Sequence, residues 1–308
     1  MKIGFLFSGQ GAQYPGMMKD LFETEPSARD VFRCADQTLG RPISEICFNG
    51  TQEEMNLTHN TQPCMLAADL AAARVLEAYG VKAAAAAGFS LGEYAALCYA
   101  GCIPMEEVFS LIQLRADAMQ EAVRPGEGAM AAFIGAAPSE VEEICIKVSS
   151  GYVTAANYNS PVQTVISGTA AGVDEACRLG QDLGLRCQKL AVSAPFHCAL
   201  MKPAADRLSR KLEAMTFGEP SVPVYMNVNG EILPGAKDAA GLLYRQAMSP
   251  VYWTRTLENM AADGIDTFIE CGAGKTLSGL VKKTLKQVRV LRVENEKTLR
   301  KTLEELED

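Results

Sequence analysis

The stretch Gly88-Phe89-Ser90-Leu91-Gly92 decides how the rest of the chain is interpreted. A Gly-x-Ser-x-Gly pattern between a strand and a helix is typical of a nucleophile elbow, a tight turn that exposes the serine hydroxyl above a sheet. The apolar run 81–87 predicts the strand, against the helix propensity of its alanines, and 91–100 predicts the helix. We expect Ser90 to be a nucleophile and the N–H of Leu91 to face an oxyanion, although an isolated match also fits a surface turn.

The overall composition indicates a globular protein and argues against two kinds of partner. With 308 residues, 48% of them apolar, the chain can bury a large core. A formal charge of −8 and the lack of a dense Lys/Arg block argue against nucleic acid. No apolar run has the length of a transmembrane helix, and the run 3–7 is too short for a signal peptide. We therefore expect a cytoplasmic protein that does not bind a membrane.

Ten cysteines are scattered along the chain without a Cys-x-x-Cys pair. Most lie in apolar contexts, where free thiols pack as small hydrophobic side chains. We expect free thiols in a reducing compartment, with neither a disulfide framework nor a zinc site.

The first apolar run, 3–7, leads into Ser8-Gly9-Gln10-Gly11. This pattern predicts a buried strand followed by a glycine-rich loop. The loop either brings the backbone close to a ligand or is an ordinary turn between a strand and a helix. A dinucleotide-binding fingerprint is disfavoured because its third glycine is missing.

Apolar residues recur at helical spacing over 26–39, 63–79 and 104–123. Pro63 and Gly80 predict the ends of the second helix, and His59, just before it, is expected at a cap or on the surface. Arg115 lies on the third helix between apolar neighbours. Either its side chain extends past them into water, or it is a buried guanidinium whose planar fork binds a carboxylate.

The order of predicted elements changes between 126 and 192. Strands at 129–134, 153–156, 162–167 and 186–192 alternate with helices at 138–148 and 171–183, in the βαββαβ order of a ferredoxin-like unit. We expect residues 126–192 to be a ferredoxin-like subdomain inserted into a large α/β domain made of 1–125 and 193–308. Within it, Asn157-Tyr158-Asn159-Ser160-Pro161 has the composition of a hairpin loop.

The last part of the chain again alternates strands (223–228, 266–270, 288–293) with helices (239–248, 252–263, 276–285, 294–306), which completes a mostly parallel sheet. His197 follows a turn at 193–195 and is the one histidine outside a plainly polar segment. Because a serine nucleophile needs a base, we expect His197 to supply it.

These features together resemble the malonyl-CoA:acyl-carrier-protein transacylases of bacterial fatty acid synthesis over the whole length of the chain. The matching stretches are 7–13, 88–94, Arg115, 157–161, 195–203, 246–253 and 272–277. The resemblance implies an α/β-hydrolase-like large domain with a mostly parallel sheet, together with an inserted ferredoxin-like subdomain.

The same resemblance assigns roles at the reacting centre. It implies that Ser90 carries the acyl group and that His197 is the general base and, in reverse, the general acid. The backbone N–H groups of Gln10 and Leu91 would form the oxyanion hole. A backbone carbonyl at Gln246 would orient the imidazole in place of a carboxylate.

Other positions are implied to bind or select the acyl group. Arg115 would hold the free carboxylate of malonate, with Asn159 nearby in the cleft. By its bulk, Phe196 should disfavour a methyl group on the α-carbon, so that malonyl is preferred over methylmalonyl. Phe89 departs from the family pattern, in which many members have histidine; since that histidine is not the base, we expect activity to survive.

The implied partners are malonyl-CoA and acyl carrier protein, in a ping-pong reaction through a malonyl-serine that releases coenzyme A and uses no cofactor or metal. The resemblance also suggests a monomer. Because the family's carrier protein is acidic, docking would need a local basic patch, although a solvated helix face is an equally good interpretation of the lysines. The candidate docking residues are Arg186, Lys189, Lys282, Lys283 and Lys286.

Three alternatives stay open at this point. A serine thioesterase or esterase would share the elbow but would not need Arg115. A discrete malonyltransferase of a polyketide pathway would share every motif. A non-catalytic carrier-binding protein is disfavoured because Ser90, His197 and Arg115 are all present.

Overall fold

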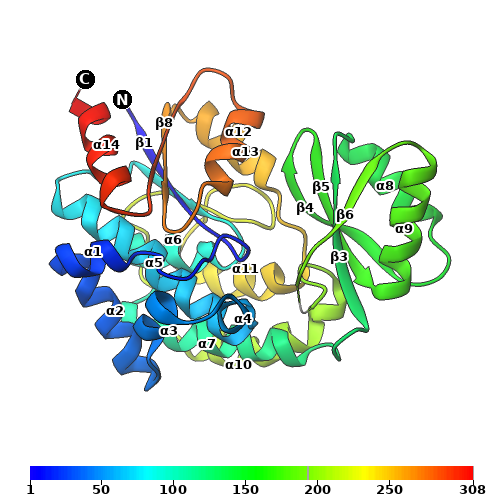
Figure 1. Cartoon of the computed structure of the whole chain (residues 1–308), viewed down its shortest axis with the longest axis horizontal. Helices are drawn as coiled ribbons and strands as arrows, with labels where there is room; N and C mark the ends of the chain where they lie inside the picture. Colours follow the sequence, from blue (N-terminus) through cyan, green and yellow to red (C-terminus); the bar gives the residue numbers. More distant parts are fainter. Residues whose placement is uncertain (193, 308) are drawn as a thin grey trace.

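Five parallel strands form the central sheet in the part of the chain that the computed structural model describes, residues 1–192 and 194–307 (Figure 1). In spatial order they are β7 (Val224–Tyr225), β2 (Ala85–Gly88), β1 (Ile3–Phe7), β8 (Thr267–Cys271) and β9 (Arg289–Val293). The register pairs Phe7 with Gly88. The loops that follow β1 and β2 therefore leave the same edge of the sheet side by side.

Helices cover both faces of this sheet. They are α1 (Lys19–Thr24), α2 (Pro26–Leu39), α3 (Ile43–Asn49), α4 (Gln52–Asn56), α5 (Thr58–Ala78), α6 (Gly92–Tyr99), α7 (Met105–Glu121), α10 (Lys202–Ala214), α11 (Ala236–Met248), α12 (Trp253–Ala262), α13 (Thr276–Thr284) and α14 (Glu296–Glu307), with a 3₁₀ turn at Ala199–Met201. Alternate side chains of β1 point to opposite faces: Phe5 and Phe7 join the core with α2, α5, α6 and α7, whereas Leu6 joins the core with α12 and α13. None of the helices in residues 1–192 and 194–307 is long and apolar enough to cross a bilayer.

A second, antiparallel sheet has the order β4-β5-β3-β6. Its elements follow the chain order β3 (Gly128–Ile134), α8 (Pro138–Lys147), β4 (Val153–Ser160), β5 (Gln163–Thr169), α9 (Ala170–Asp182) and β6 (Arg186–Lys189). This is the predicted βαββαβ order, and α8 and α9 cover the side of the sheet that faces away from the larger sheet (Figure 1). The fold class expected from the sequence is confirmed. The expected domain boundary at 193 falls on a residue outside the described part of the chain.

The small sheet is joined by backbone hydrogen bonds, at the outer edge of β4, to the segment between α11 and α12. Asn157 forms a parallel bridge with Val251, whose N–H donates to Ala156 O at 2.8 Å and whose carbonyl accepts from Tyr158 N at 2.9 Å. The rings of Tyr158 and Tyr252 stack with centroids 5.0 Å apart. These contacts place the edge of the small sheet directly beside the segment that leads into α12.

The prediction of a hairpin loop at 157–161 is wrong. β4 continues to Ser160, with irregular register between Ala155 and Asn157 and between Tyr158 and Ser160. The asparagines favour a turn by propensity, but a strand partner on each side supplies the hydrogen bonds that such a segment would otherwise lack. Asn157 and Asn159 are therefore strand residues two positions apart.

Three predicted strands are shorter in the structure. β2 begins only at Ala85, β6 ends at Lys189 rather than at 192, and β7 holds two residues of the predicted 223–228. Apolar character shows that a residue is buried but does not show where pairing ends. Leu190 and Val192, for example, line a cavity instead of extending the sheet.

The second scaffold helix, α5, begins at Thr58 and not near Pro63. Proline lacks the N–H that would bond to the carbonyl of His59 four residues earlier. That carbonyl accepts instead from Arg41 Nη1 at 3.2 Å and from Gln113 Nε2 at 3.3 Å. His59 thus lies in the first helical turn, and its backbone has a scaffold role.

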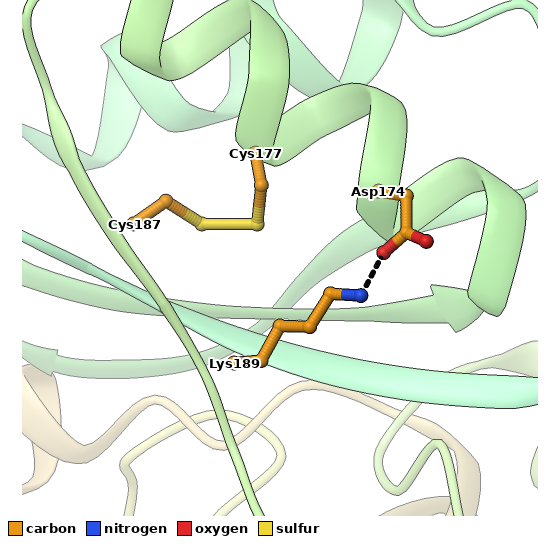
Figure 2. Close-up of a disulfide and its surroundings, with 4 residues drawn as sticks. All are labelled: Asp174, Cys177, Cys187 and Lys189. Atoms are coloured by element: carbon orange, nitrogen blue, oxygen red, sulfur yellow. Dashed lines mark ion pairs between the residues drawn. A yellow bond between two sulfur atoms is a disulfide. The ribbon is translucent and has the colours of Figure 1, made fainter.

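The prediction that the cysteines are free thiols is wrong for one pair. Cys177 on α9 and Cys187 on β6 form a disulfide, and an ion pair between Asp174 and Lys189 joins the same two elements (Figure 2). The bond fastens the edge strand β6 to the helix that covers it. The other eight cysteines are free, and six of them are buried.

Candidate active site

The elbow between β2 and α6 has almost no free space. A Cβ at Gly88 would lie 1.9 Å from the backbone of Gly92, and a Cβ at Gly92 would lie 2.3 Å from Phe7 O. Only glycine fits at either position. Between them, Ser90 has φ of 55°, in the left-handed region, where a non-glycine residue costs roughly 1–3 kcal/mol.

Ser90 and His197 form a hydrogen-bonded pair. Ser90 Oγ lies 2.7 Å from His197 Nε2, and His197 Nδ1 lies 3.0 Å from the backbone carbonyl oxygen of Gln246. Because a carbonyl only accepts, Nδ1 carries the ring proton and Nε2 is left to accept from the serine hydroxyl. Burial, reinforced by the nearby Arg115 guanidinium, lowers the pKa of His197 to about 3. The imidazole is therefore neutral at pH 7, as a base must be.

Arg115 is buried at the same centre with 1% of its surface exposed, which excludes the alternative that it reaches into water. Its Nη2 lies 3.1 Å from Ser90 Oγ and 3.0 Å from Gln246 Oε1, and its Nη1 donates to Gln62 Oε1 at 2.7 Å. Its Nε has no hydrogen-bond partner within residues 1–192 and 194–307, and none of the ion pairs in those ranges includes Arg115. The guanidinium also lies over the Tyr94 ring, 5.3 Å from its centroid.

A buried cation without an ion-pair partner is costly unless an anion accompanies it. Burial lowers the pKa of Arg115, but guanidinium remains charged at neutral pH because its ordinary pKa exceeds 12. The arrangement is therefore suited to an anionic group close to the serine hydroxyl.

Two backbone N–H groups beside Ser90 are free to bind an oxyanion. Gln10, in the loop after β1, and Leu91, after the serine, both line the cavity. Neither amide donates a hydrogen bond to another residue in the described ranges. The N-terminal end of α6 adds a favourable dipole for negative charge.

A cavity of about 190 Å³ encloses these groups. The domain of the large sheet contributes the residues of the reacting centre. The region of the small sheet contributes mainly apolar lining residues, namely Met130, Val165, Leu190 and Val192. Phe196 lines the cavity next to His197 and is 8% exposed. Phe89 also lines it and packs edge-on against Trp253, with ring centroids 5.4 Å apart.

Two asparagines of β4 face the same cavity. Asn157 and Asn159 are 4% and 8% exposed, and Asn159 Oδ1 has no hydrogen-bond partner among the described residues. An unpartnered buried amide oxygen is costly. It is available to a polar group of a bound molecule.

All eight predicted site residues lie in or against this one site, whereas His59 does not line it. Sequence reasoning missed Asn227 and Glu93, which are fully buried and hydrogen-bonded next to the elbow, and Gln62, which holds Arg115. Glu93 and Tyr94 directly follow the motif, and this position could have identified them as residues close to the nucleophile. Asn227 stands in a loop after β7 with no local signal. No group of three potential metal ligands occurs in residues 1–192 and 194–307.

Comparisons with known proteins agree along the whole chain. The profile of the family described as "Acyl transferase domain" matches residues 4–303. A protein of Bacillus subtilis described as "Malonyl CoA-acyl carrier protein transacylase" is 40% identical over 310 residues, covering 100% of this chain and 98% of that protein. A protein of Escherichia coli with the same description is 41% identical, covering 92% of each.

Solved structures give the same result. The malonyl CoA-acyl carrier protein transacylase from Clostridium perfringens matches with a TM-score of 0.96 and 42% identity, over 100% of this chain and 98% of that one. A malonyl-transacylase solved in complex with its type II PKS acyl-carrier protein matches with a TM-score of 0.96 and 38% identity, over 99% of this chain and 100% of that one.

Proposed function

The chain belongs to the acyl transferase family, and we propose that it moves a malonyl group from malonyl-CoA to the phosphopantetheine thiol of acyl carrier protein. The descriptions of its full-length relatives support this reaction. Within the site, one observation carries the proposal. The buried Arg115 guanidinium, which forms no ion pair with a described carboxylate, lies 3.1 Å from the hydroxyl of Ser90.

In the first half-reaction, Ser90 Oγ attacks the thioester carbon of malonyl-CoA while His197 Nε2 takes the hydroxyl proton. The tetrahedral intermediate collapses, the carbon–sulfur bond breaks, and His197 returns the proton to the leaving thiolate of coenzyme A. A malonyl ester of Ser90 remains. The 2.7 Å contact between the two side chains is already the geometry needed for that proton transfer.

The backbone N–H groups of Gln10 and Leu91 support the proposed oxyanion hole. Both line the cavity beside Ser90 and are free of other partners in the described ranges. Removing one such donor typically costs about 3 kcal/mol of barrier stabilisation. The register that pairs Phe7 with Gly88 brings the two donors together from separate loops.

In the second half-reaction, the carrier protein's thiol gives its proton to His197 and attacks the malonyl ester. The Ser90 oxygen leaves and takes the proton back. Gln246 supports this double role because its backbone carbonyl keeps Nδ1 protonated in both directions. The apolar wall from the small sheet restricts access of water, which would otherwise hydrolyse the ester.

Acyl selectivity follows from Arg115 and Phe196. The guanidinium would bind the free carboxylate of malonate and would leave an acetyl group without a comparable contact. Phe196 narrows the cavity next to His197, which supports a preference for malonyl over methylmalonyl. Asn159 Oδ1, unpartnered at the cavity wall, would accept a hydrogen bond from the pantetheine arm.

The proposed reaction needs no cofactor, because side chains and backbone of this chain supply the nucleophile, the base and the oxyanion donors. A monomer suffices for the same reason. We place the reaction in fatty acid biosynthesis. Service to a polyketide pathway is the second candidate, favoured by the 38% identical transacylase that was solved with a PKS carrier protein.

For docking of the acidic carrier protein, the structure favours α13 over the small sheet. Lys282 lines a hollow of about 660 Å³ between α13 and α14, together with Lys275, Lys297 and Lys301. Lys189 is paired with Asp174 of α9, whereas of the four lysines in the hollow only Lys301 has an ion-pair partner in the described ranges, Glu305. Reversing the charge at Lys275 and Lys282 should raise KM for the carrier protein about tenfold without changing acylation by malonyl-CoA. Lys211→Glu, on α10, is the control.

The test of the proposed function compares malonyl and acetyl transfer to acyl carrier protein in the wild type and in Arg115→Ala. We expect strong malonyl transfer in the wild type, and in the variant a loss of malonyl transfer with acetyl transfer spared or raised. Arg41→Ala is the matched control, since it removes a partly buried guanidinium that binds neutral groups away from the cavity. Equal effects of both substitutions on both acyl groups would overturn the carboxylate role.

A parallel assay without carrier protein tests the hydrolase alternative. A transacylase should accumulate one malonyl group on Ser90, visible by intact mass, and release it only slowly. Rapid release of malonate without a thiol acceptor would favour a thioesterase. Equal transfer to fatty acid and polyketide carrier proteins would leave the pathway open, whereas a large preference would assign it.

A further inference from the structure

The conformation of Ser90 needs external support. Its φ of 55° lies in a region that L-residues avoid, and such a residue persists only where the surroundings fix it. Two peptide groups flank the serine, and each could rotate away if its N–H and C=O were free. The hydrogen bonds of these two peptide groups therefore decide where the hydroxyl points.

Asn227 brackets the elbow from the β7 side. Its Oδ1 accepts from the backbone N–H of Ser90 at 2.7 Å, and its Nδ2 donates to the backbone carbonyl of Gly88 at 2.7 Å. One side-chain amide thus binds both the residue at the nucleophile position and the last residue of β2. Asn227 itself is fully buried and lies 137 positions further along the chain than Ser90.

The backbone of Asn227 is held in turn by the elbow's own helix. Its N–H donates to the carboxyl group of Glu93, in the first turn of α6, and its carbonyl accepts from Tyr252 N at 2.9 Å. Because the N–H of Glu93 also donates to the carbonyl of Ser90 at 3.1 Å, Ser90, Asn227 and Glu93 form a closed ring of hydrogen bonds. Glu93 is fully buried, and its second oxygen has no partner among the described residues.

The opposite side of Ser90 is held by Gln246, whose Nε2 donates to the serine carbonyl at 2.6 Å. In a trans peptide the C=O and the following N–H point in opposite directions. Fixing Ser90 O on Gln246 thus directs the N–H of Leu91 away from Gln246. The serine's own amide has one side-chain partner, Asn227. Asn227 therefore supports the serine, although it takes no part in the proposed reaction.

We propose that Asn227, anchored by Glu93, is a positioning residue that holds Ser90 in its left-handed conformation and so sets the rate of acylation. The inference rests on the proposed function, because Ser90 must be the nucleophile. Asn227 is not one of the described residues that line the cavity, so its loss should leave substrate binding intact. Misplacing a reacting atom by about 1 Å can cost about 10²-fold in rate.

The experiment measures the rate of malonyl-enzyme formation by quenched flow and intact mass, together with KM for malonyl-CoA. Asn227→Ala should lower the acylation rate about 10²-fold, with KM changed less than threefold. Asn229→Ala changes a residue two positions on in the same loop, whose side chain is hydrogen-bonded to Glu231 at the surface and to no other residue in the described ranges, and it should acylate as the wild type does. A rise in KM at an unchanged rate would overturn the proposal.

Glu93 provides a second variant series in case Asn227→Ala folds poorly. Burial raises the pKa of Glu93 to about 8, so its carboxyl is mostly protonated at pH 7 and a carboxamide is a close substitute. Glu93→Gln should therefore keep at least a third of the wild-type rate, whereas Glu93→Ala should fall with Asn227→Ala. The double Ala variant should be no slower than the slower single one, because the two residues act as one unit.

The outcomes separate this inference from the proposed function. If the wild type forms no malonyl-Ser90, the proposed function is wrong. If the wild type is acylated and folded Asn227 variants are acylated equally fast, Asn227 is only structural and the inference is wrong. Additive losses in the double variant, or a loss in Glu93→Gln as large as in Glu93→Ala, would also contradict it.

Discussion

The surroundings of the elbow and the small antiparallel sheet meet at one cavity, but the first buries its polar groups and the second exposes most of its charged ones. Around the elbow, Ser90 is hydrogen-bonded to both His197 and Arg115, and each of those two side chains also bonds to Gln246 inside the core. In the small sheet, ionic groups form exposed pairs on the outer surface, such as Arg178 with Asp182. Its contribution to the cavity is apolar wall and two asparagines.

The difference indicates that the elbow region carries out the reaction and that the small sheet encloses the site. Exposed ion pairs contribute little to stability and tolerate change, whereas a buried network loses its function when one member is removed. This division predicts that substitutions affect malonyl transfer most at the elbow and progressively less towards the far side of the small sheet.

The largest effect is expected at His197. His197→Ala should lower the rate of malonyl-enzyme formation at least about 10⁴-fold, because loss of one member of a nucleophile–base unit typically removes most of its contribution. The measurement is single-turnover acylation followed by intact mass. His59→Ala serves as the control, since His59 does not line the cavity. Comparable losses in both variants would mean that His197 acts on folding and not on the reaction.

The pH dependence of acylation comes next. The reaction needs neutral His197, whose pKa is lowered to about 3, so protonation of His197 should cause no loss of kcat/KM between pH 8 and pH 5. A histidine with its ordinary pKa of about 6.5 would lose about 30-fold over that range. The profile is measured with malonyl-CoA alone, so that the carrier protein's own titration does not enter. A midpoint near pH 6.5 would show that the imidazole is not shielded as the structure indicates.

Stability changes in the same pH range and must be followed separately. The folded state resists protonation of His197 down to about pH 3, whereas the unfolded chain binds that proton near pH 6.5. The stability contributed by this group is therefore present above pH 6.5 and is lost as the pH falls towards 3. Fluorescence of the single tryptophan, Trp253, reports the folded fraction in each kinetic sample.

The sequence predicted the elbow and its neighbours because their signals are local. Gly88 is required by a contact within the turn, and Gly92 belongs to the same five-residue pattern although its close neighbour, Phe7, lies on β1. Arg115 was a candidate because a charge stood among apolar neighbours. Asn227 could not be predicted, since the partners of its side chain, Ser90 and Gly88, lie more than 130 positions away. The strand at Asn157 and Asn159 was missed for the same reason: its outer partner, Val251, belongs to the other sheet's surroundings.

A smaller effect is expected at Phe196, where the wall meets the reacting centre. Phe196→Ala should raise the ratio of methylmalonyl to malonyl transfer about tenfold, because space for one added methyl group in an apolar pocket is worth roughly 1–3 kcal/mol. The two acyl-CoA substrates are compared in competition. Val165→Ala, on the wall contributed by β5, is the companion variant and should change the ratio less. An unchanged ratio in Phe196→Ala would place the limit on the α-carbon elsewhere.

The smallest effect on transfer is expected at the far side of the small sheet, where Cys187→Ser removes the disulfide to Cys177. The two cysteines are 10 positions apart, and closing a loop of such length stabilises by at most about 3 kcal/mol. Hydrogen exchange should therefore rise in α9 and β6 while the transfer rate stays within twofold. Cys145→Ser, which removes a partly buried free thiol from α8 of the same region, controls for the loss of a sulfur.

Leu190 and Val192 continue from β6 into the cavity wall, so a faster release of malonate by hydrolysis, at an unchanged acylation rate, would still fit a region that only encloses the site. A slower acylation would not, since it would show that the small sheet also positions the reacting groups.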